Sequence, residues 1–301
     1  MYIKKTKRIK ENFSDRTFNT ILLVICTIFL LLVLYPLIYI VSSSFSSGSA
    51  VTAGKVLLWP VDVSVTGYEI VFKNQAIWSG YKNTIIYTVL GSILHVVMTI
   101  LIAYPLSRKT YWARGLMTTL FTIPMFFGGG LIPSYILVSN LNLVNTRTWM
   151  VISGAVAIGH VIIMRTFFQS SIPEELLESA KLDGISDIGY LMKMVIPLSK
   201  ASISVIMLYT MVDHWNSYFT AMIYLRDREL YPLQLVLREI LNASKIDATQ
   251  ITDSEVIAKL SGAADVMKYA LIVVSTVPML ILYPFVQKFF EKGVMIGSVK
   301  G

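Results

Sequence analysis

The sequence predicts an all-α integral membrane protein with six transmembrane helices, and three observations support that prediction. Of the 301 residues, 55% are hydrophobic and only 15% are charged, and the mean hydropathy is +0.65. Six stretches are long and apolar enough to cross a bilayer, which takes about 20 residues in a helix. A single long polar stretch, Pro173–Ser199, separates two of them. This composition excludes a soluble enzyme or a soluble binding module.

The six predicted spans divide the chain into three parts. Residues 1–17 form a basic N-terminal segment, residues 18–287 form the transmembrane domain, and residues 288–301 form a C-terminal tail. The first apolar run is too long for the core of a signal peptide, so we expect it to be a retained span. The predicted spans are 18–41, 84–106, 116–138, 148–164, 201–224 and 269–287.

The third predicted span is interrupted by residues that break helices. It contains Pro124, the three glycines Gly128–Gly130, and Pro133. Non-helical backbone is tolerated at membrane depth only where it faces protein or a wet cavity, because lipid offers it no hydrogen bonds. We therefore expect this span to face the interior of the helix bundle.

Lysine and arginine residues predict the orientation of the spans. With the N-terminus inside, sixteen of the 26 basic residues lie in inner segments and ten in outer ones, and six of those ten belong to one long loop. Positive charge in short loops marks the cytoplasmic side, whereas long loops follow the rule weakly. We expect a multi-pass protein of a bacterial-type plasma membrane with both termini cytoplasmic, Ser42–Tyr81 outside and Pro173–Ser199 inside. The sequence contains no basic soluble module of the kind that binds nucleic acid, so no nucleic-acid partner is expected.

The polar stretch Pro173–Ser199 has the pattern of helix, turn and helix. Pro173 suits the first turn of a helix, and Gly184 can end that helix at positive φ. Ser186 can cap a second helix, which Pro197 is expected to end. Pattern alone leaves open an amphipathic loop that lies on the membrane surface. The expected apolar faces are Leu176, Leu177, Ala180 and the stem of Lys181 in the first helix, and Ile188, Leu191, Met192, Val195 and Ile196 in the second.

The spacing within this stretch resembles the EAA loop found in the membrane subunits of ABC importers. The residues that carry the resemblance are Glu178, Ser179, Ala180, Asp183, Gly184 and, thirteen residues later, Pro197. Ser179 stands where the motif usually has alanine, and its small side chain preserves close helix packing. The resemblance covers nearly the whole chain and is closest to the type I, maltose-like carbohydrate permeases. The ending Lys292–Gly301 is similar to that of the subgroup that handles complex oligosaccharides.

The resemblance implies a type I ABC importer permease fold in which the loop at 170–200 forms cytoplasmic coupling helices. In that family the loop docks into a cleft of an ATPase subunit, and a short C-terminal tail reaches into the ATPase interface. A disordered tail is the alternative. The implied partners are a second homologous permease, two ABC ATPase subunits, an extracellular solute-binding protein and the lipid bilayer. ATP and Mg²⁺ would be bound by the partner ATPase, with no cofactor in this chain, and ATPase closure would drive inward transport of an oligosaccharide by alternating access.

Asp213 is the only acidic residue inside a predicted span. A charge at membrane depth is costly and by default faces a cavity or a partner. Aromatic faces and planar hydrogen-bonding groups commonly hold sugars, and the segment Trp215–Tyr218 resembles the W-N-x-[FY] signature of carbohydrate permeases. Interhelical hydrogen bonding uses the same residue types and stays open as the other interpretation. The candidate substrate-path residues are Asp213, His214, Trp215, Asn216 and Tyr218.

No pattern in the sequence predicts catalysis or a metal site. His95, His160 and His214 are scattered over three spans, and each is expected to be a hydrogen-bonded packing residue. The single Cys26 excludes a disulfide within the chain. Gly293–Gly301 lacks the spacing of a phosphate loop, so ATP hydrolysis is assigned to another subunit. Two alternatives remain, a permease of the same fold for a non-sugar solute and a membrane scaffold that transports nothing.

Overall fold

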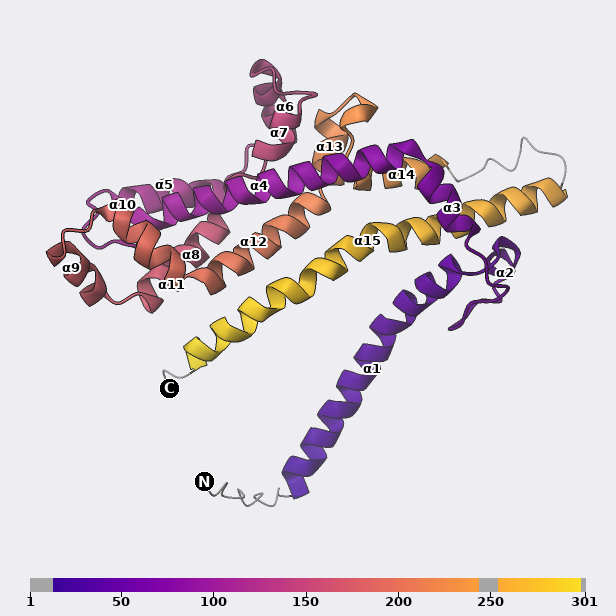
Figure 1. Ribbon diagram of the computed structural model, residues 1–301, viewed down its shortest axis with the longest axis horizontal. Helices are drawn as coiled ribbons and strands as arrows, with labels where there is room; N and C mark the ends of the chain where they lie inside the picture. The colour runs from indigo at the N-terminus through magenta and orange to yellow at the C-terminus, as the bar shows by residue number, and fades with distance from the viewer. Residues whose placement is uncertain (1–12, 244–253, 299–301) are drawn as a thin grey trace. The chain divides into compact units, whose positions relative to one another are not determined.

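The computed structural model describes residues 13–243 and 254–298, and every regular element in them is a helix (Figure 1). Most of the N-terminal segment predicted over 1–17, and the end of the tail predicted over 288–301, lie outside these residues. The helices are α1 (Phe13–Ser44), α2 (Gly48–Thr52), α3 (Thr66–Lys73), α4 (Gln75–Ser107), α5 (Arg114–Phe126), α6 (Leu131–Asn140), α7 (Arg147–Ile152), α8 (Ile158–Ser171), α9 (Glu174–Leu182), α10 (Asp187–Tyr190), the π-helix η1 (Leu191–Val195), α11 (Ile196–Leu198), α12 (Lys200–Trp215), α13 (Tyr218–Tyr224), the 3₁₀ turn η2 (Arg228–Leu230), α14 (Leu233–Ala243) and α15 (Ser254–Ser298).

Three of the described helices are long and apolar enough to cross a membrane by themselves: α1, α4 and the Gly262–Pro284 part of α15. Two bent pairs also pass this test, α5 with α6 at 115° and Asp187–Leu198 with α12 at 79°. By length and composition, the described part of the chain therefore holds three candidate spans, or up to five if each bent pair is one span. The predicted span 148–164 is split, because α7 ends at Ile152 and α8 begins only at Ile158.

The break predicted in the third span is confirmed. Helix α5 ends at Phe126, α6 begins at Leu131, and Gly130 adopts a φ of +82° between them. The chain covers this span only in part: α5 has no fully buried residue and α6 buries only Val138, although Met117 and Phe121 of α5 pack against the core formed with α4 and α8. No other described helix of the chain covers its broken backbone, which at membrane depth requires protein or water beside it.

The chain forms two compact units, residues 1–71 with 246–273, and residues 72–245 with 274–301. In the first unit, Gly48 of α2 and Gly262 of α15 meet so closely that a Cβ added at Gly48 would lie 2.6 Å from the carbonyl carbon of Gly262. The rings of Tyr39 and Tyr269 meet edge to face at 5.6 Å. Glycine permits this approach of two backbones, a common device between membrane helices.

Helix α4 is the centre of the second unit. Helices α5, α8 and α12 lie along it (Figure 1), and hydrogen bonds from polar side chains of α4 hold the segment from η2 to α14. The Asn83 amide donates to the Glu229 carbonyl at 2.7 Å, the Tyr87 hydroxyl donates to the Leu230 carbonyl at 2.9 Å, and the Thr84 hydroxyl accepts from the Leu233 N–H at 2.8 Å. These interhelical bonds account for three of the polar residues in a mostly apolar helix.

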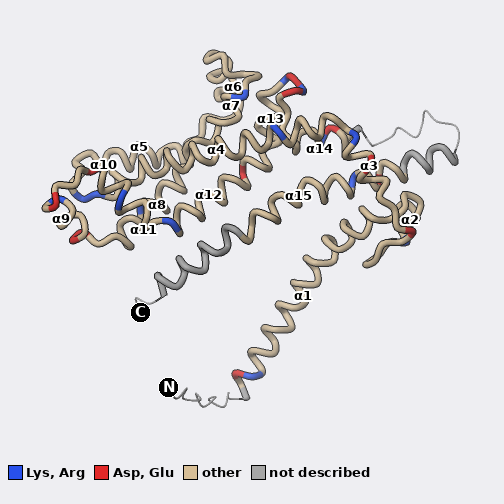
Figure 2. The backbone as a smooth tube through the Cα atoms, viewed as in Figure 1, with Lys and Arg blue, Asp and Glu red and all other residues tan. Residues whose placement is uncertain are grey.

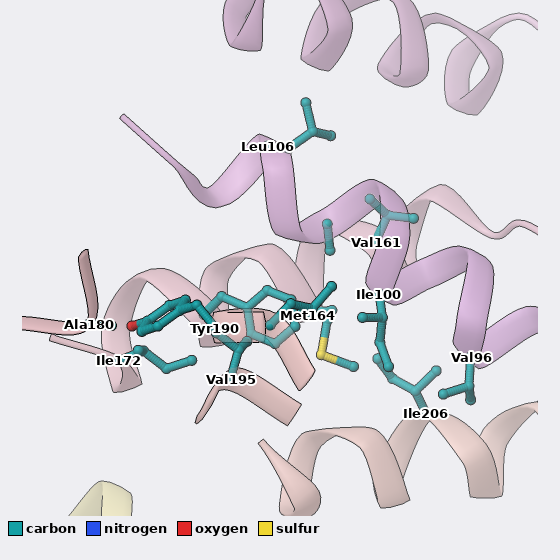
Figure 3. Close-up of a cluster of buried hydrophobic side chains, with 13 residues drawn as sticks. Val96, Ile100, Leu106, Val161, Met164, Ile172, Ala180, Tyr190, Val195 and Ile206 are labelled. Carbon is teal, nitrogen blue, oxygen red and sulfur yellow. The ribbon is translucent and has the colours of Figure 1, made fainter. Parts of the chain in front are cut away.

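An apolar core joins α4, α8 and α12 to the segment from α9 to η1. Buried side chains from these elements converge on one another (Figure 3). Ile100 of α4, Met164 of α8 and Ile206 of α12 are each at most 7% exposed, and Tyr190 of α10 is fully buried. This core places the segment from α9 to α11 at the end of α4, where charged residues of the unit gather (Figure 2). That segment therefore packs directly against the spans.

Candidate functional site

The polar stretch folds as the sequence predicts at its turn. Gly184, between α9 and α10, adopts a φ of +73°, and the Ser186 hydroxyl accepts a hydrogen bond from the Gly189 N–H at 3.2 Å. Pro173 is the N-cap of α9, one place before the first helical residue. A Cβ added at Gly184 would meet nothing within 4 Å, so the requirement for glycine there comes from the backbone alone.

The packed face of the second helix differs from the expected one. Leu191 and Val195 are buried as expected, but Ile188 is 76% exposed and Met192 60% exposed, and Tyr190 is buried in their place. The π-helical segment Leu191–Val195 widens the turn between Tyr190 and Val195, and both of these residues are fully buried in the core.

The end of the second helix also departs from expectation. Pro197 does not end it: the helical turn of α11 continues through Leu198, and the chain bends at Ser199, whose φ is −100° and ψ is 12°. A proline near the start of a short helical turn is compatible with that turn, because its missing N–H lies at a position without an intrahelical partner.

The EAA-like residues divide into one buried and several exposed side chains. Ala180 is 2% exposed and packs into the core, whereas Glu178, Ser179 and Asp183 are exposed. Among the described residues, no hydrogen bond or ion pair engages the side chain of Glu178. The α9 helix is tied to the segment after α4 through Lys109 Nζ, which lies 2.9 Å from a carboxylate oxygen of Glu174.

Arg108 at the end of α4 connects that helix to the second helix of the loop. Its guanidinium carbon lies 4.6 Å from the ring centroid of Tyr104 and 5.1 Å from that of Tyr190. Cation–π contacts of this kind are worth more when they are desolvated. The sequence analysis did not single out these three residues, because the pairing depends on the fold.

Three of the candidate substrate-path residues are engaged in packing. The Trp215 indole N–H donates to the Ser275 carbonyl at 3.1 Å and so joins α12 to α15. The Asn216 amide donates to the Val212 carbonyl of its own helix at 3.0 Å, and the Tyr218 ring lies 5.0 Å from the Arg238 guanidinium carbon. For Trp215 this geometry favours interhelical hydrogen bonding.

Asp213 and His214 instead line a polar pocket of about 210 Å³. Its walls come from His95 of α4, from the α7–α8 connection at Ser153–Ala157, and from α12 and the residues that follow it. Asp213 is exposed and His214 is buried. The pocket lies where the sequence analysis expected a substrate path, but it lacks the expected aromatic face.

The fold brings the three histidines together. His95 Nε2 lies 2.9 Å from His160 Nδ1, and His95 Nδ1 lies 2.6 Å from the Gly154 carbonyl oxygen. The His214 ring packs against Gly91 and Gly154. The three histidines lie on three different helices as expected, and His95 and His160 are hydrogen-bonded as predicted, whereas no hydrogen bond engages the His214 ring among the described residues. Within the described residues, no group of three or more His, Cys, Asp or Glu side chains is placed to hold a metal ion.

Comparison with known proteins decides the family. Residues 95–296 match the family described as "Binding-protein-dependent transport system inner membrane component". The chain belongs to this family. This inner membrane component is 35% identical over 288 residues to the polygalacturonan/rhamnogalacturonan transport system permease protein YtcP of Bacillus subtilis (strain 168), which covers 96% of this chain and 100% of that protein. It is 35% identical over 266 residues to protein LplC of the same organism, with 88% and 89% covered.

A solved structure agrees with the family. The crystal structure of a bacterial ABC transporter involved in the import of the acidic polysaccharide alginate contains a chain that is 35% identical and matches with a TM-score of 0.84. The match covers 94% of this permease and 99% of that chain. As a family member, the permease is a multi-pass component of the inner membrane, belongs to an ABC transporter, and is not the catalytic subunit.

Proposed function

We propose that this permease moves an oligosaccharide into the cell by alternating access, driven by partner ATPase subunits. The observation that carries the proposal is the full-length likeness, at 35% identity, to a permease named for polygalacturonan and rhamnogalacturonan. Further relatives named for sugars include the melibiose/raffinose/stachyose import permease protein MelC of Bacillus subtilis (strain 168), 24% identical over 250 residues. A permease for a non-sugar solute is the second candidate, and a scaffold without transport is the third.

The segment from α9 to α11 is proposed as the docking surface for the ATPase. Three large apolar side chains stand out from it, Leu182 at 90% exposed, Ile188 and Met192. Exposed apolar side chains rimmed by polar ones are typical of a protein interface. Beside them Glu178 is free to pair with a basic residue of the partner, which would bind ATP and Mg²⁺. A scaffold would have no use for such a surface, so it supports the transport proposal.

The bent pair α5 and α6 is proposed to face the second permease subunit. Phe126 and Phe127 are each 77% exposed at the break, and the glycines that follow are exposed as well. Broken backbone at membrane depth needs protein or water beside it. A homologous permease packed against α5 and α6 would supply the protein, and a transport path between the two subunits would supply the water. With α7 and α8 counted as one broken span, the chain would then cross the membrane six times.

Reconstitution tests the proposed function. The tagged permease should copurify with a second permease and an ATPase, and the assembled importer with its solute-binding protein should accumulate an oligosaccharide in proteoliposomes when ATP is supplied. Trigalacturonate and galactotriose are suitable probes because relatives of this permease are named for the transport of polygalacturonan and of galactooligosaccharides. The isolated chain should show no ATP hydrolysis. Hydrolysis by the chain freed of all other subunits, or uptake of amino acids in place of either sugar, would contradict the proposal.

The proposed topology is tested by cysteine labelling. In a Cys26→Ala background, Ser179→Cys should react with a membrane-impermeant thiol reagent only after the membrane is opened, and Ser49→Cys should react in intact cells. Both serines are exposed, so neither result depends on unfolding, and the asymmetry of basic residues is the physical reason for the expected sides. Labelling of position 179 from outside would reverse the topology.

A further inference from the structure

Asp213 contributes a carboxylate to the wall of the polar pocket. Asp213 lies on α12, in the middle of a stretch that the sequence predicts to be at membrane depth, and no hydrogen bond or ion pair joins its carboxylate to any other residue that the structure describes. An ionised carboxylate away from bulk water needs hydrogen-bond donors or a cation. None of the serine, threonine and histidine side chains in the described walls donates a hydrogen bond to it, so its oxygens are open to a water molecule or a ligand in the pocket.

His214, the next residue, places a second hydrogen-bonding group on the same wall. Its ring is held against α4, where a Cβ added at Gly91 would lie 2.5 Å from Nε2. No hydrogen bond engages the His214 ring within the described part of the chain. A neutral imidazole offers one donor and one acceptor. Asp213 and His214 together therefore present acceptors and one donor to the pocket.

The opposite wall is held by a directed chain of hydrogen bonds. A carbonyl oxygen only accepts, so His95 must carry its proton on Nδ1, which bonds to Gly154. In the tautomer with its single proton on Nδ1, His95 accepts at Nε2, and the matching tautomer of His160 donates to it from Nδ1. This pair ties α4 and α8 to the α7–α8 connection at Gly154, and that connection lines the pocket. The wall is thus pre-organised without using Asp213 or His214.

From these contacts we propose that the pocket is a subsite for one sugar ring, whose adjacent hydroxyl groups donate to Asp213 and bond to His214. Each sugar hydroxyl both donates and accepts, so a neighbouring pair matches this combination of carboxylate and imidazole. The pocket volume of about 210 Å³ suits a single ring of a longer chain. No Phe, Tyr or Trp side chain lines it, so hydrogen bonds would select the ring. The proposal rests on the proposed oligosaccharide transport and names residues of this chain that contact the sugar.

Kinetics of the assembled importer test the subsite. Asp213→Asn removes the charge with little change of shape, and His214→Gln keeps a donor and an acceptor. Because hydrogen bonds to charged groups are stronger than neutral ones, Asp213→Asn should raise the concentration for half-maximal uptake about tenfold or more for both galactotriose and trigalacturonate. His214→Gln should have a smaller effect. Ser204→Ala is the control, because that hydroxyl bonds within α12 to the Lys200 carbonyl and should leave uptake unchanged.

The outcomes separate the subsite from the function. If the wild-type importer moves neither sugar, the proposed function fails. If it moves them and Asp213→Asn matches both wild type and control, the subsite is wrong and the function stands. Improved uptake of trigalacturonate alone in Asp213→Asn would show that the carboxylate faces the sugar's own carboxylate, which overturns hydroxyl recognition. A dependence of wild-type uptake on Na⁺ that Asp213→Asn abolishes would assign the pocket to a cation instead. The yield of assembled complex, measured for each variant, identifies a variant that fails to fold.

Discussion

Replacing Gly184 by valine should uncouple ATP hydrolysis from transport in the assembled importer. Gly184 forms the turn between α9 and α10 at a φ of +73°, a conformation that costs an L-residue about 1–2 kcal/mol, with a β-branched residue at the high end. No neighbouring atom lies within 4 Å of an added Cβ, so the cost is purely one of backbone conformation. The turn should therefore shift, and with it the docking surface proposed above.

The matched control for this variant is Gly184→Asn, because asparagine tolerates positive φ better than other residues with a side chain. It should keep most of the uptake, while valine loses it. Uptake and stimulated ATPase activity are measured together in proteoliposomes. Equal uptake in the valine and asparagine variants would show that the conformation of Gly184 has no part in coupling.

Glu178→Ala tests the same surface from its charged side. If Glu178 pairs with a basic residue in a partly buried interface, its truncation should cost about 2–5 kcal/mol of assembly or coupling energy. Glu175→Ala on the same helix is the control, since Glu175 is exposed and lies outside the EAA-like residues. If the loop is a passive surface loop that does not dock to the ATPase, Glu178→Ala should show normal uptake with normal stimulated hydrolysis. That result would remove the support for a docking role.

Gly91→Ala should displace His214 and damage both the packing of α4 on α12 and the polar pocket. A Cβ at Gly91 would overlap the imidazole, lying 2.5 Å from its Nε2. Overpacking of this kind typically costs about 1–3 kcal/mol, because neighbouring side chains or helices must move. We expect a lower midpoint of thermal unfolding in detergent and a lower affinity for the transported sugar.

Gly115→Ala is the control for this variant, because a Cβ at Gly115 meets nothing within 4 Å and alanine is the better helix former. It should be neutral or slightly more stable than wild type. The double variant Gly91→Ala with His214→Ala should recover part of the stability, since the imidazole that the new Cβ would overlap is then absent. If Gly91→Ala unfolds at the same temperature as Gly115→Ala, the close contact between Gly91 and His214 is not limiting for packing.

Features set by local chemistry are those that the sequence predicted well. The positive φ of Gly184, the cap from Ser186 and the helix break at Gly128–Gly130 each depend on residues within a few positions of one another. Glycine conformation and serine capping act at that range whatever the rest of the chain does. The EAA-like spacing also lies within one segment, and it indicated the family that the comparisons show.

Errors arose where a residue's surroundings depend on distant segments. The third span was expected to face the interior of the bundle, but no described helix of this chain covers its broken backbone at Gly128–Gly130, because hydropathy does not say whether the cover comes from the same chain. Ile188 and Met192 were expected to pack but are exposed, whereas Tyr190 and Val195, on either side of the π-helical turn that begins at Leu191, are buried. Such a bulge depends on the core against which Tyr190 packs.

By itself, the sequence determined a helical membrane protein, the position of its broken span, and the turn of its loop, since composition and short-range backbone preferences decide these. Tertiary structure alone decided that His95, His160 and His214 meet beside Asp213. These residues come from three helices whose relative rotation is set by the packing of whole faces, with small residues such as Gly91 admitting a ring between them. Helical spacing says which residues share a face, and only the packed fold says which faces meet.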